Sequence, residues 1–266
     1  ADMCIRDSVE ALTVVAGNVG LDQAVQNALY TVELCGKETP VYAGRAQPIM
    51  RTLETAQSIH GHDGMGDCGL PLHGRTPTAG RGVDVIVDTI LGSPGEVTLV
   101  CLGPLSNIAA AFLRAPEITE AVERVVIMGG TGVHGPGNVS AMAEFNFWAD
   151  PEAAAIVTAS GMPLEFVGWD ISITAAIVTQ ERHDAMLAIG TMALRLTISH
   201  VGPDATGNDL AIESLHEGVQ RIIAGYCLLG GSKTGGSECR GGRCHGRDRF
   251  SRSRRRFAVG TFRRGR

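Results

Sequence analysis

The chain has 266 residues, 44% of them hydrophobic, and this size and composition suit one α/β domain with a large buried core. It has no run of about eighteen apolar residues and no basic and then apolar leader, so neither a membrane span nor a signal peptide is expected. The seven cysteines are scattered without a C-x-x-C pair, which argues against a disulfide framework and a zinc site. We therefore expect a cytoplasmic protein that has no membrane partner.

The net charge of −5 conceals an uneven distribution, because residues 233–266 contain twelve Lys and Arg against only Glu238 and Asp248. This segment carries +10 and the rest of the chain −15. One interpretation is a disordered basic arm that binds nucleic acid or another polyanion through charge. The interpretation that we favour is a segment read out of frame, because GC-rich coding DNA translated in the wrong frame gives this Arg, Gly and Ser bias. Nucleic acid is therefore the less favoured partner.

Apolar strands alternate with amphipathic helices along the chain. Residues 9–16 predict a buried strand, and the helical spacing of apolar residues predicts a helix over about 21–35. By the same patterns, strands are predicted at 97–102, 125–128 and 164–169, and helices at 107–113, from about 151, and at 210–229. Apolar strands that alternate with helices form a parallel sheet covered on both faces. The predicted fold class is therefore α/β: a three-layer α/β/α sandwich with a doubly wound, mostly parallel sheet.

Two polar residues stand directly ahead of a marked helix start. Glu144 and Asn146 are two residues apart, and in an extended segment this spacing puts both on one side, with the phenylalanine between them on the other. Asp150 has the chemistry of an N-cap, and Pro151 suits the first helical position. The sequence therefore predicts that an acceptor and an amide are presented together at an element boundary.

Polar and glycine-rich residues follow the predicted strands. In open parallel sheets, ligands bind beyond the carboxyl ends of the strands. Asn18, Leu102, Met128 and Asp170 all fall at such ends. Four strand ends on one rim predict a single concave site.

A glycine-rich loop contains His60, His62 and Asp63. Their spacing fits no standard zinc site, and histidines in such a loop are usually solvated. Neither G-x-G-x-x-G after a strand nor G-x-x-x-x-G-K-[ST] occurs, so this is not a phosphate loop.

Six motifs in order carry a family resemblance. They are Val15-Ala-Gly-Asn18, His60-Gly-His-Asp-Gly-Met-Gly-Asp67, Leu102-Gly-Pro-Leu-Ser-Asn-Ile-Ala109, Met128-Gly-Gly130, Gly137-Asn138, and Ala143-Glu-Phe-Asn146 with Asp150-Pro-Glu-Ala-Ala154. Together they resemble the inosine–uridine preferring nucleoside hydrolases over about residues 9–190. The resemblance implies hydrolysis of the N-glycosidic bond of a ribonucleoside to ribose and free base, on a Ca²⁺ ion that holds the attacking water and the ribose diol. It also suggests a homodimer or homotetramer.

The same resemblance implies roles for individual residues. Leu102 would give its backbone carbonyl to the metal, as suits a hard cation that prefers oxygen ligands. His60 would line the base pocket, and Met128 would pack against the sugar. The substrate-binding residues implied in this way are Asn18, His60, Met128, Asn138, Glu144, Phe145 and Asn146.

The chain departs from the family at both ends. The N-terminal aspartate cluster, which in the family binds Ca²⁺ and includes the general base, has no counterpart, so no catalytic residue is assigned. We therefore interpret residues 1–8 as a non-native leader, 9–232 as an incomplete nucleoside hydrolase-like domain and 233–266 as a basic tail, disordered or out of frame. His216-Glu217 lies near the distance of the family's late metal segment but within a predicted helix.

These departures lead to two expectations about the chain as it stands. It should be inactive, and its sheet should have a gap or an exposed edge where a strand is missing. The alternative is a non-catalytic nucleoside- or polyanion-binding protein that uses the basic tail.

Overall fold

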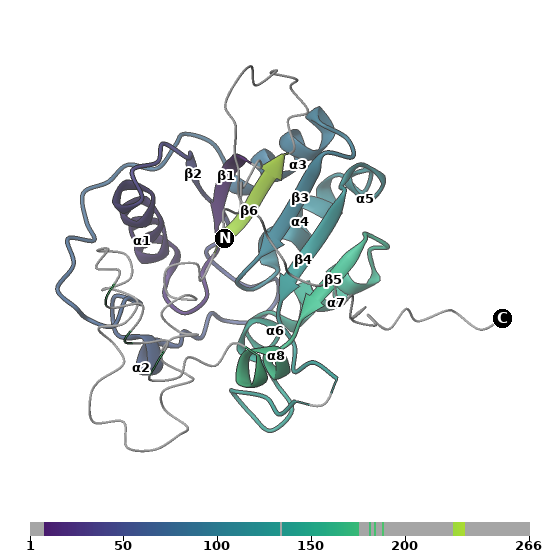
Figure 1. Ribbon diagram of the computed structural model, residues 1–266. Coiled ribbons are helices and arrows are strands. Elements are labelled where there is room, and N and C mark those ends of the chain that lie inside the picture. The colour runs from purple at the N-terminus through teal and green to yellow at the C-terminus, as the bar shows by residue number, and fades with distance from the viewer. Residues whose placement is uncertain are drawn as a thin grey trace, which may run out of the picture. The chain divides into compact units, whose positions relative to one another are not determined.

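A six-stranded sheet organises the part of the chain that the computed structural model describes, residues 8–133, 135–175, 181, 184, 188 and 226–231. The strands are β1 (Ser8–Val14), β2 (Val41–Ala43), β3 (Val97–Cys101), β4 (Arg124–Met128), β5 (Leu164–Val167) and β6 (Tyr226–Gly231). The helices are α1 (Leu21–Leu34), α2 (Gln57–His60), α3 (Gly82–Gly92), α4 (Ser106–Arg114), α5 (Ile118–Ala121), α6 (Phe145–Ala149), α7 (Pro151–Ala159) and α8 (Trp169–Thr174). Figure 1 shows their arrangement.

The strand order is β2-β1-β6-β3-β4-β5. The pairs β1–β2, β3–β4 and β4–β5 are parallel, as expected for strands that are joined through helices. The predicted strands at 9–16, 97–102, 125–128 and 164–169 correspond to β1, β3, β4 and β5, so the prediction of an α/β fold with a mostly parallel sheet is confirmed.

Strand β6 lies between β1 and β3 and runs antiparallel to both. Leu228 is the register partner of Leu12 on one side and of Val100 on the other. The predicted helix at 210–229 is therefore wrong over 226–229, and its remainder, including His216 and Glu217, lies outside the described residues. A short apolar run suits a helix or a strand equally well, and here the pairing on both sides favours the strand. Because β6 fills this position, the described sheet continues without a gap from β2 to β5.

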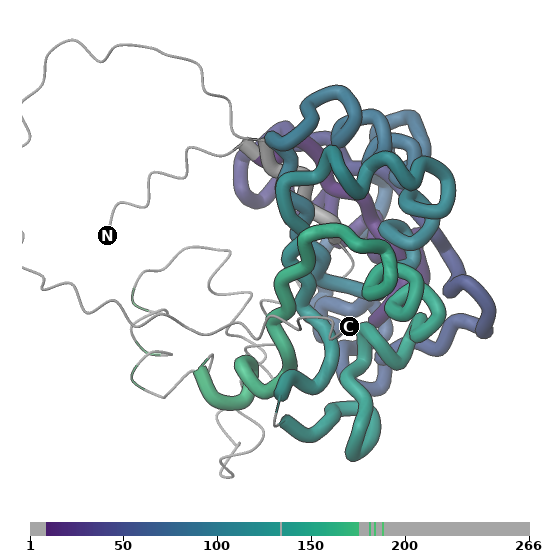
Figure 2. The backbone as a smooth tube through the Cα atoms, turned by 90° about the vertical axis from the view of Figure 1, so that its right-hand side faces the viewer, coloured from purple at the N-terminus to yellow at the C-terminus, as the bar shows by residue number. Residues whose placement is uncertain are grey.

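Helices cover both faces of the sheet. On one face, the buried residues of α1 pack with Leu12 and Val14 of β1 and with Val41 of β2. On the other face, buried residues of α3, α4 and α7 pack with β3 and β4 in a larger apolar core that includes Leu99 and Ile127. In Figure 2 the β5 side of this arrangement faces the viewer. The strands thus form a middle layer, with α1 over β1 and β2 on one face and α3, α4 and α7 over β3 and β4 on the other. Phe166 and Val167 of β5 are 48% and 37% exposed.

Contacts divide the chain into residues 1–233 and residues 234–266. The second unit lies outside the described residues. None of the described helices combines the length and the apolar character needed to cross a membrane.

Candidate functional site

Strands β3, β4 and β5 point toward one edge of the sheet, where α6 and α8 lie (Figure 1). Leu102 follows β3 directly, and Met128 is the last residue of β4. The side chain of Asn146 joins them, because its amide Nδ2 lies 3.1 Å from the carbonyl oxygen of Met128 and 3.4 Å from that of Leu102. The same Nδ2 lies 3.4 Å from the sulfur of Met128. Three residues that the sequence analysis selected separately therefore meet at one point.

Glu144 is the N-cap of α6, with only 2% of its surface exposed. Its Oε1 accepts the backbone N–H of Asn146 at 2.9 Å. Its Oε2 accepts the N–H of Gly130 at 2.9 Å and that of Phe147 at 3.3 Å. Burial raises the pKa of Glu144 above its ordinary value, although these three N–H groups act in the opposite direction.

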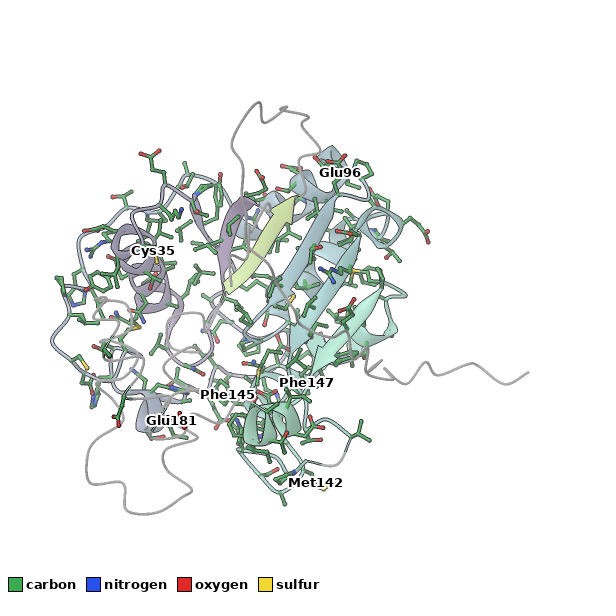
Figure 3. The ribbon with its side chains drawn as sticks, viewed as in Figure 1. Cys35, Glu96, Met142, Phe145, Phe147 and Glu181 are labelled. Carbon is green, nitrogen blue, oxygen red and sulfur yellow. The ribbon has the colours of Figure 1, made fainter. Side chains whose placement is uncertain are left out.

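Helix α6 corrects one prediction. The sequence analysis placed Glu144 and Asn146 in an extended segment, with phenylalanine on the opposite side, but residues 145–149 are helical. The physical reason is the carboxylate of Glu144, because it caps the first backbone N–H groups of the helix and so replaces the missing helical partners. Phe145 and Phe147 both belong to this helix (Figure 3).

Asp150 holds the far end of α6 in place. Its Oδ1 accepts the N–H of Ala153 at 3.0 Å, which confirms the predicted N-cap of α7, with Pro151 at the first position. Its Oδ2 also accepts the hydroxyl of Ser106 at 2.5 Å and the N–H of Ile49 at 2.9 Å. The carboxylate is fully buried and ties together α4, α7 and the segment after β2. Sequence reasoning found the cap and missed these two tertiary contacts.

The loop that precedes α6 approaches it through Asn138. The side-chain oxygen of this exposed residue accepts the N–H of Phe145 at 2.8 Å, and its own N–H donates to the carbonyl of Ala143 at 3.0 Å. Met142, 86% exposed, lies on the same loop, which projects beyond α6 (Figure 3). Asn138 is thus held beside Phe145, the residue that follows Glu144, and these three predicted substrate-binding residues lie close together.

Gly129, directly after β4, lies so close to Phe147 that it has no space for a side chain. A Cβ at Gly129 would lie 2.5 Å from the ring of Phe147, so any side chain there would displace α6. The next residue, Gly130, has a φ of 74° and gives its N–H to Glu144. The Gly-Gly pair after β4 therefore lets α6 pack against the strand end.

Asn18 and His60 form a second group on the rim. The carbonyl of Asn18 accepts the N–H of Ala56 at 3.0 Å, and the N–H of His60 donates to the carbonyl of Ala56 at 2.9 Å. His60 ends α2 and is 7% exposed, so the prediction of a solvated histidine is wrong at this position. It is correct for His62, whose side chain is 95% exposed.

A family model described as inosine-uridine preferring nucleoside hydrolase matches residues 3–223. The chain belongs to this family. The pyrimidine-specific ribonucleoside hydrolase RihB of Escherichia coli (strain K12 / DH10B) is 44% identical over 162 residues, which cover 60% of this chain and 51% of RihB. The chain therefore spans about half the length of the curated nucleoside hydrolases that it matches.

Solved structures of nucleoside hydrolases have a similar fold. The purine-preferring ribonucleoside hydrolase from Gardnerella vaginalis superposes with a TM-score of 0.69 at 29% identity, covering 81% of this chain and 72% of that one. A plant nucleoside hydrolase, the PpNRh1 enzyme, gives a TM-score of 0.67 at 29% identity, covering 81% and 70%. The family resemblance stated from the motifs is thereby confirmed.

A calcium ion is the cofactor that the family resemblance implies, and the described donor set does not fit it. Ca²⁺ takes six to eight oxygen ligands, several of them carboxylates. The carbonyl of Leu102 lies against the amide of Asn146, and both oxygens of Glu144, two residues before Asn146, accept backbone N–H groups. Within the described residues, no group of three or more His, Cys, Asp and Glu could hold a metal ion. We therefore derive no chemical step through Ca²⁺ from these residues.

Proposed function

We propose that the chain binds ribonucleosides at the rim formed by Leu102, Met128 and α6, and that the whole protein from which such a chain derives hydrolyses their N-glycosidic bond. The chain belongs to the nucleoside hydrolase family, and one observation supports the proposal: Glu144 and Asn146 lie side by side at the carboxyl ends of β3 and β4. An acidic oxygen and an amide at this place suit the hydroxyls of a ribose.

The lone pairs of Glu144 define what can still bind there. A carboxylate oxygen accepts about two hydrogen bonds. Oε2 already accepts two N–H groups, whereas Oε1 accepts that of Asn146 alone among the described residues. Oε1 can therefore accept one further hydrogen bond, and the low exposure of Glu144 limits the donor to a small group, so we assign Oε1 to the 2′-hydroxyl of the ribose.

Hydrolysis itself makes further demands. Cleavage of the bond builds positive charge on the ribose, so a site must orient the sugar and deliver an activated water. The residues named above can orient the sugar, but they include no assigned general base. We therefore propose that the 266-residue chain hydrolyses nucleosides no faster than the background rate, with Ca²⁺ present or absent. A cytoplasmic location, Ca²⁺ in the whole protein and a homodimer or homotetramer stay predictions from the sequence.

Ligand-detected NMR with the full chain tests recognition separately from turnover. We expect uridine to bind roughly tenfold more tightly than 2′-deoxyuridine, the effect of one hydrogen bond to a buried acceptor. Asn146→Ala should weaken uridine binding, while Thr158→Ala, which removes a hydroxyl that bonds only to its own helix α7, should leave it unchanged. Equal binding of the two nucleosides would contradict the proposed sugar recognition.

A reducing-sugar assay of the same protein tests turnover. Ribose release from uridine should equal that of buffer, with or without millimolar Ca²⁺. Sustained release that a chelator abolishes would contradict the proposed inactivity and leave the proposed binding intact.

A further inference from the structure

Asn107, the second residue of α4, is a buried polar residue outside the contacts described above, with only 2% of its surface exposed. Its side-chain Nδ2 donates to the carbonyl of Val14, the last residue of β1, at 3.1 Å and lies 3.4 Å from the carbonyl oxygen of Thr13. Its Oδ1 accepts the backbone N–H of Arg45 at 2.8 Å. The amide therefore uses both its donor and its acceptor to join α4 to the end of β1 and to the segment after β2.

Gly44, directly after β2, leaves space for this amide. A Cβ at Gly44 would lie 2.4 Å from both Nδ2 and Oδ1 of Asn107, which is closer than such atoms can come. The N–H of Gly44 donates to the carbonyl of Val14 at 2.9 Å, so this carbonyl accepts hydrogen bonds from Gly44 and Asn107 together. The amide of Asn107 thus has a defined place between the end of β1 and the residues after β2.

These hydrogen bonds connect two strands that do not pair with each other. β6 lies between β1 and β3, and Asn107 belongs to the helix that follows β3. The connection continues toward Asn18, because the carbonyl of Arg45 accepts the N–H of Ala16 at 3.0 Å. Asn107 therefore links the helix after β3 to the turn after β1.

The residue before Asn107 makes a corresponding contact on the other side of the rim. The hydroxyl of Ser106 donates to the carboxylate of Asp150, the C-cap of α6. Helix α6 carries Asn146, whose amide lies against the carbonyls of Leu102 and Met128. Two consecutive residues of α4 thus connect the turn that contains Asn18 to the proposed ribose site.

The turn that contains Asn18 also packs directly against the loop between Leu102 and α4. A Cβ at Gly17 would lie 3.0 Å from Cδ of Pro104 in this loop. Asn18 itself is half-buried, and among the described residues its side-chain amide has no recorded hydrogen-bond partner. Its amide is thus available to a ligand beside Leu102.

We propose that Asn107 is a positioning residue that holds the amide of Asn18 at the site of Leu102 and Asn146, so that one ribonucleoside contacts Asn18 and Asn146 at the same time. An amide side chain both donates and accepts, as the hydroxyls of a ribose require. Without the amide of Asn107, the contact to Asn18 is lost and the contact to Asn146 remains. The inference rests on the proposed ribonucleoside binding and adds to it a residue that acts through another.

A double-mutant cycle on the full chain tests whether Asn107 acts through Asn18. By ligand-detected NMR, we expect Asn107→Ala to weaken uridine binding about tenfold, the effect of one lost hydrogen bond. In an Asn18→Ala background the same substitution should change the affinity by less than about twofold, because the contact is already absent. A residue that only stabilises the fold would weaken binding equally in both backgrounds.

Asn27→Ala is the matched control. Asn27 is also a buried asparagine, and its amide bonds to the side chain of Gln23 and the carbonyl of Asp63, not to a strand end. Any effect of Asn27→Ala on uridine binding should therefore be equal with and without Asn18→Ala. The same coupling to Asn18 in Asn27→Ala as in Asn107→Ala would contradict the assigned role.

Asn107→Asp keeps the shape of the side chain and decides the matter if Asn107→Ala does not fold. A neutral carboxyl can accept the N–H of Arg45 and donate to the carbonyl of Val14, whereas an ionised one can only accept. Burial beside two carbonyl oxygens raises the pKa of such a carboxyl. The affinity of this variant for uridine, relative to that of the wild-type chain at the same pH, should therefore fall about tenfold between about pH 5 and about pH 8.

The outcomes separate the two proposals. If uridine does not bind to the wild-type chain, the proposed function fails and the role of Asn107 fails with it. If uridine binds, two results overturn only the role of Asn107: an equal effect of Asn107→Ala in both backgrounds, or a relative affinity of Asn107→Asp that does not change with pH.

Discussion

Glu144 and Asp67 are two carboxylates whose pKa values move in opposite directions. Each accepts three hydrogen bonds that the structure records, two of those to Asp67 and all of those to Glu144 coming from backbone N–H groups. Burial raises the pKa of Glu144, whereas hydrogen bonds lower that of Asp67 to about 2. The side chain of Asp67 is 47% exposed, whereas Glu144 is 2% exposed. Desolvation, and not the number of donors, therefore decides the direction of the shift.

This difference distinguishes a buried carboxylate, Glu144, from a half-exposed one, Asp67. The buried carboxylates at the two ends of α6, those of Glu144 and Asp150, accept most of their hydrogen bonds from backbone N–H groups, including those of Gly130 and Ile49, and so connect α6 to neighbouring segments. In the loop after α2, by contrast, the carboxylate of Asp67 binds the backbone N–H and the imidazole of His62, whose side chain is 95% exposed. We therefore expect substitutions of the buried polar residues around α6 to change the free energy of unfolding more than substitutions in the exposed loop after α2.

Asp150 is a second buried carboxylate at α6, and its substitution should change the free energy of unfolding more than any other considered below. Asp150→Ala removes an N-cap and leaves the hydroxyl of Ser106 and the N–H of Ile49 without this acceptor. We expect a loss of about 4 kcal/mol in the free energy of unfolding, from the lost cap and the buried groups left unpaired. Urea denaturation followed by tryptophan fluorescence measures it. Asp88→Ala, at an exposed position of α3, is the control, and equal losses in both variants would show that Asp150 does not have this role.

Glu144→Gln should give an intermediate effect with a characteristic pH dependence. A carboxyl with a raised folded-state pKa contributes its stability fully below the unfolded value of about 4.5 and loses it as pH rises through the folded pKa. The wild-type chain should therefore lose stability relative to Glu144→Gln as pH rises from 4 to 8, by about 1.4 kcal/mol for each unit of the shift. Urea denaturation at several pH values measures the difference. Parallel curves for the two proteins would mean that burial does not raise this pKa.

The sequence predicted the elements whose local signals are strong. Continuous apolar runs predicted β3 and β4, and Asp150 followed by Pro151 predicted the start of α7. These signals act within a few residues, so no tertiary information is needed to interpret them.

The failures all depended on tertiary contacts. Glu144 and Asn146 were predicted in an extended segment, but the carboxylate of Glu144 caps α6 and also accepts the N–H of Gly130, which lies beyond the end of β4. The apolar residues of β6 suit a helix or a strand equally well, and the pairing with β1 and β3 on either side makes them a strand. His60 and His62 are two residues apart in the sequence, but His60 is buried as the last residue of α2, and the side chain of His62, beyond the end of α2, is exposed.

The smallest expected effect comes from Asp67, and it has the opposite sign from that of Glu144. A carboxyl with a lowered folded-state pKa contributes stability above the unfolded value of about 3.8 and loses it as pH falls through about 2. Asp67→Asn cannot titrate, so the wild-type chain should lose stability relative to this variant below pH 4 and run parallel to it above pH 5. Urea denaturation between pH 2 and pH 6 measures this, with Asp88→Asn as the exposed control. A wild-type advantage that grows on acidification would contradict the assigned hydrogen bonds, because protonation of Asp67 must weaken its hold on His62 and on the backbone of the loop.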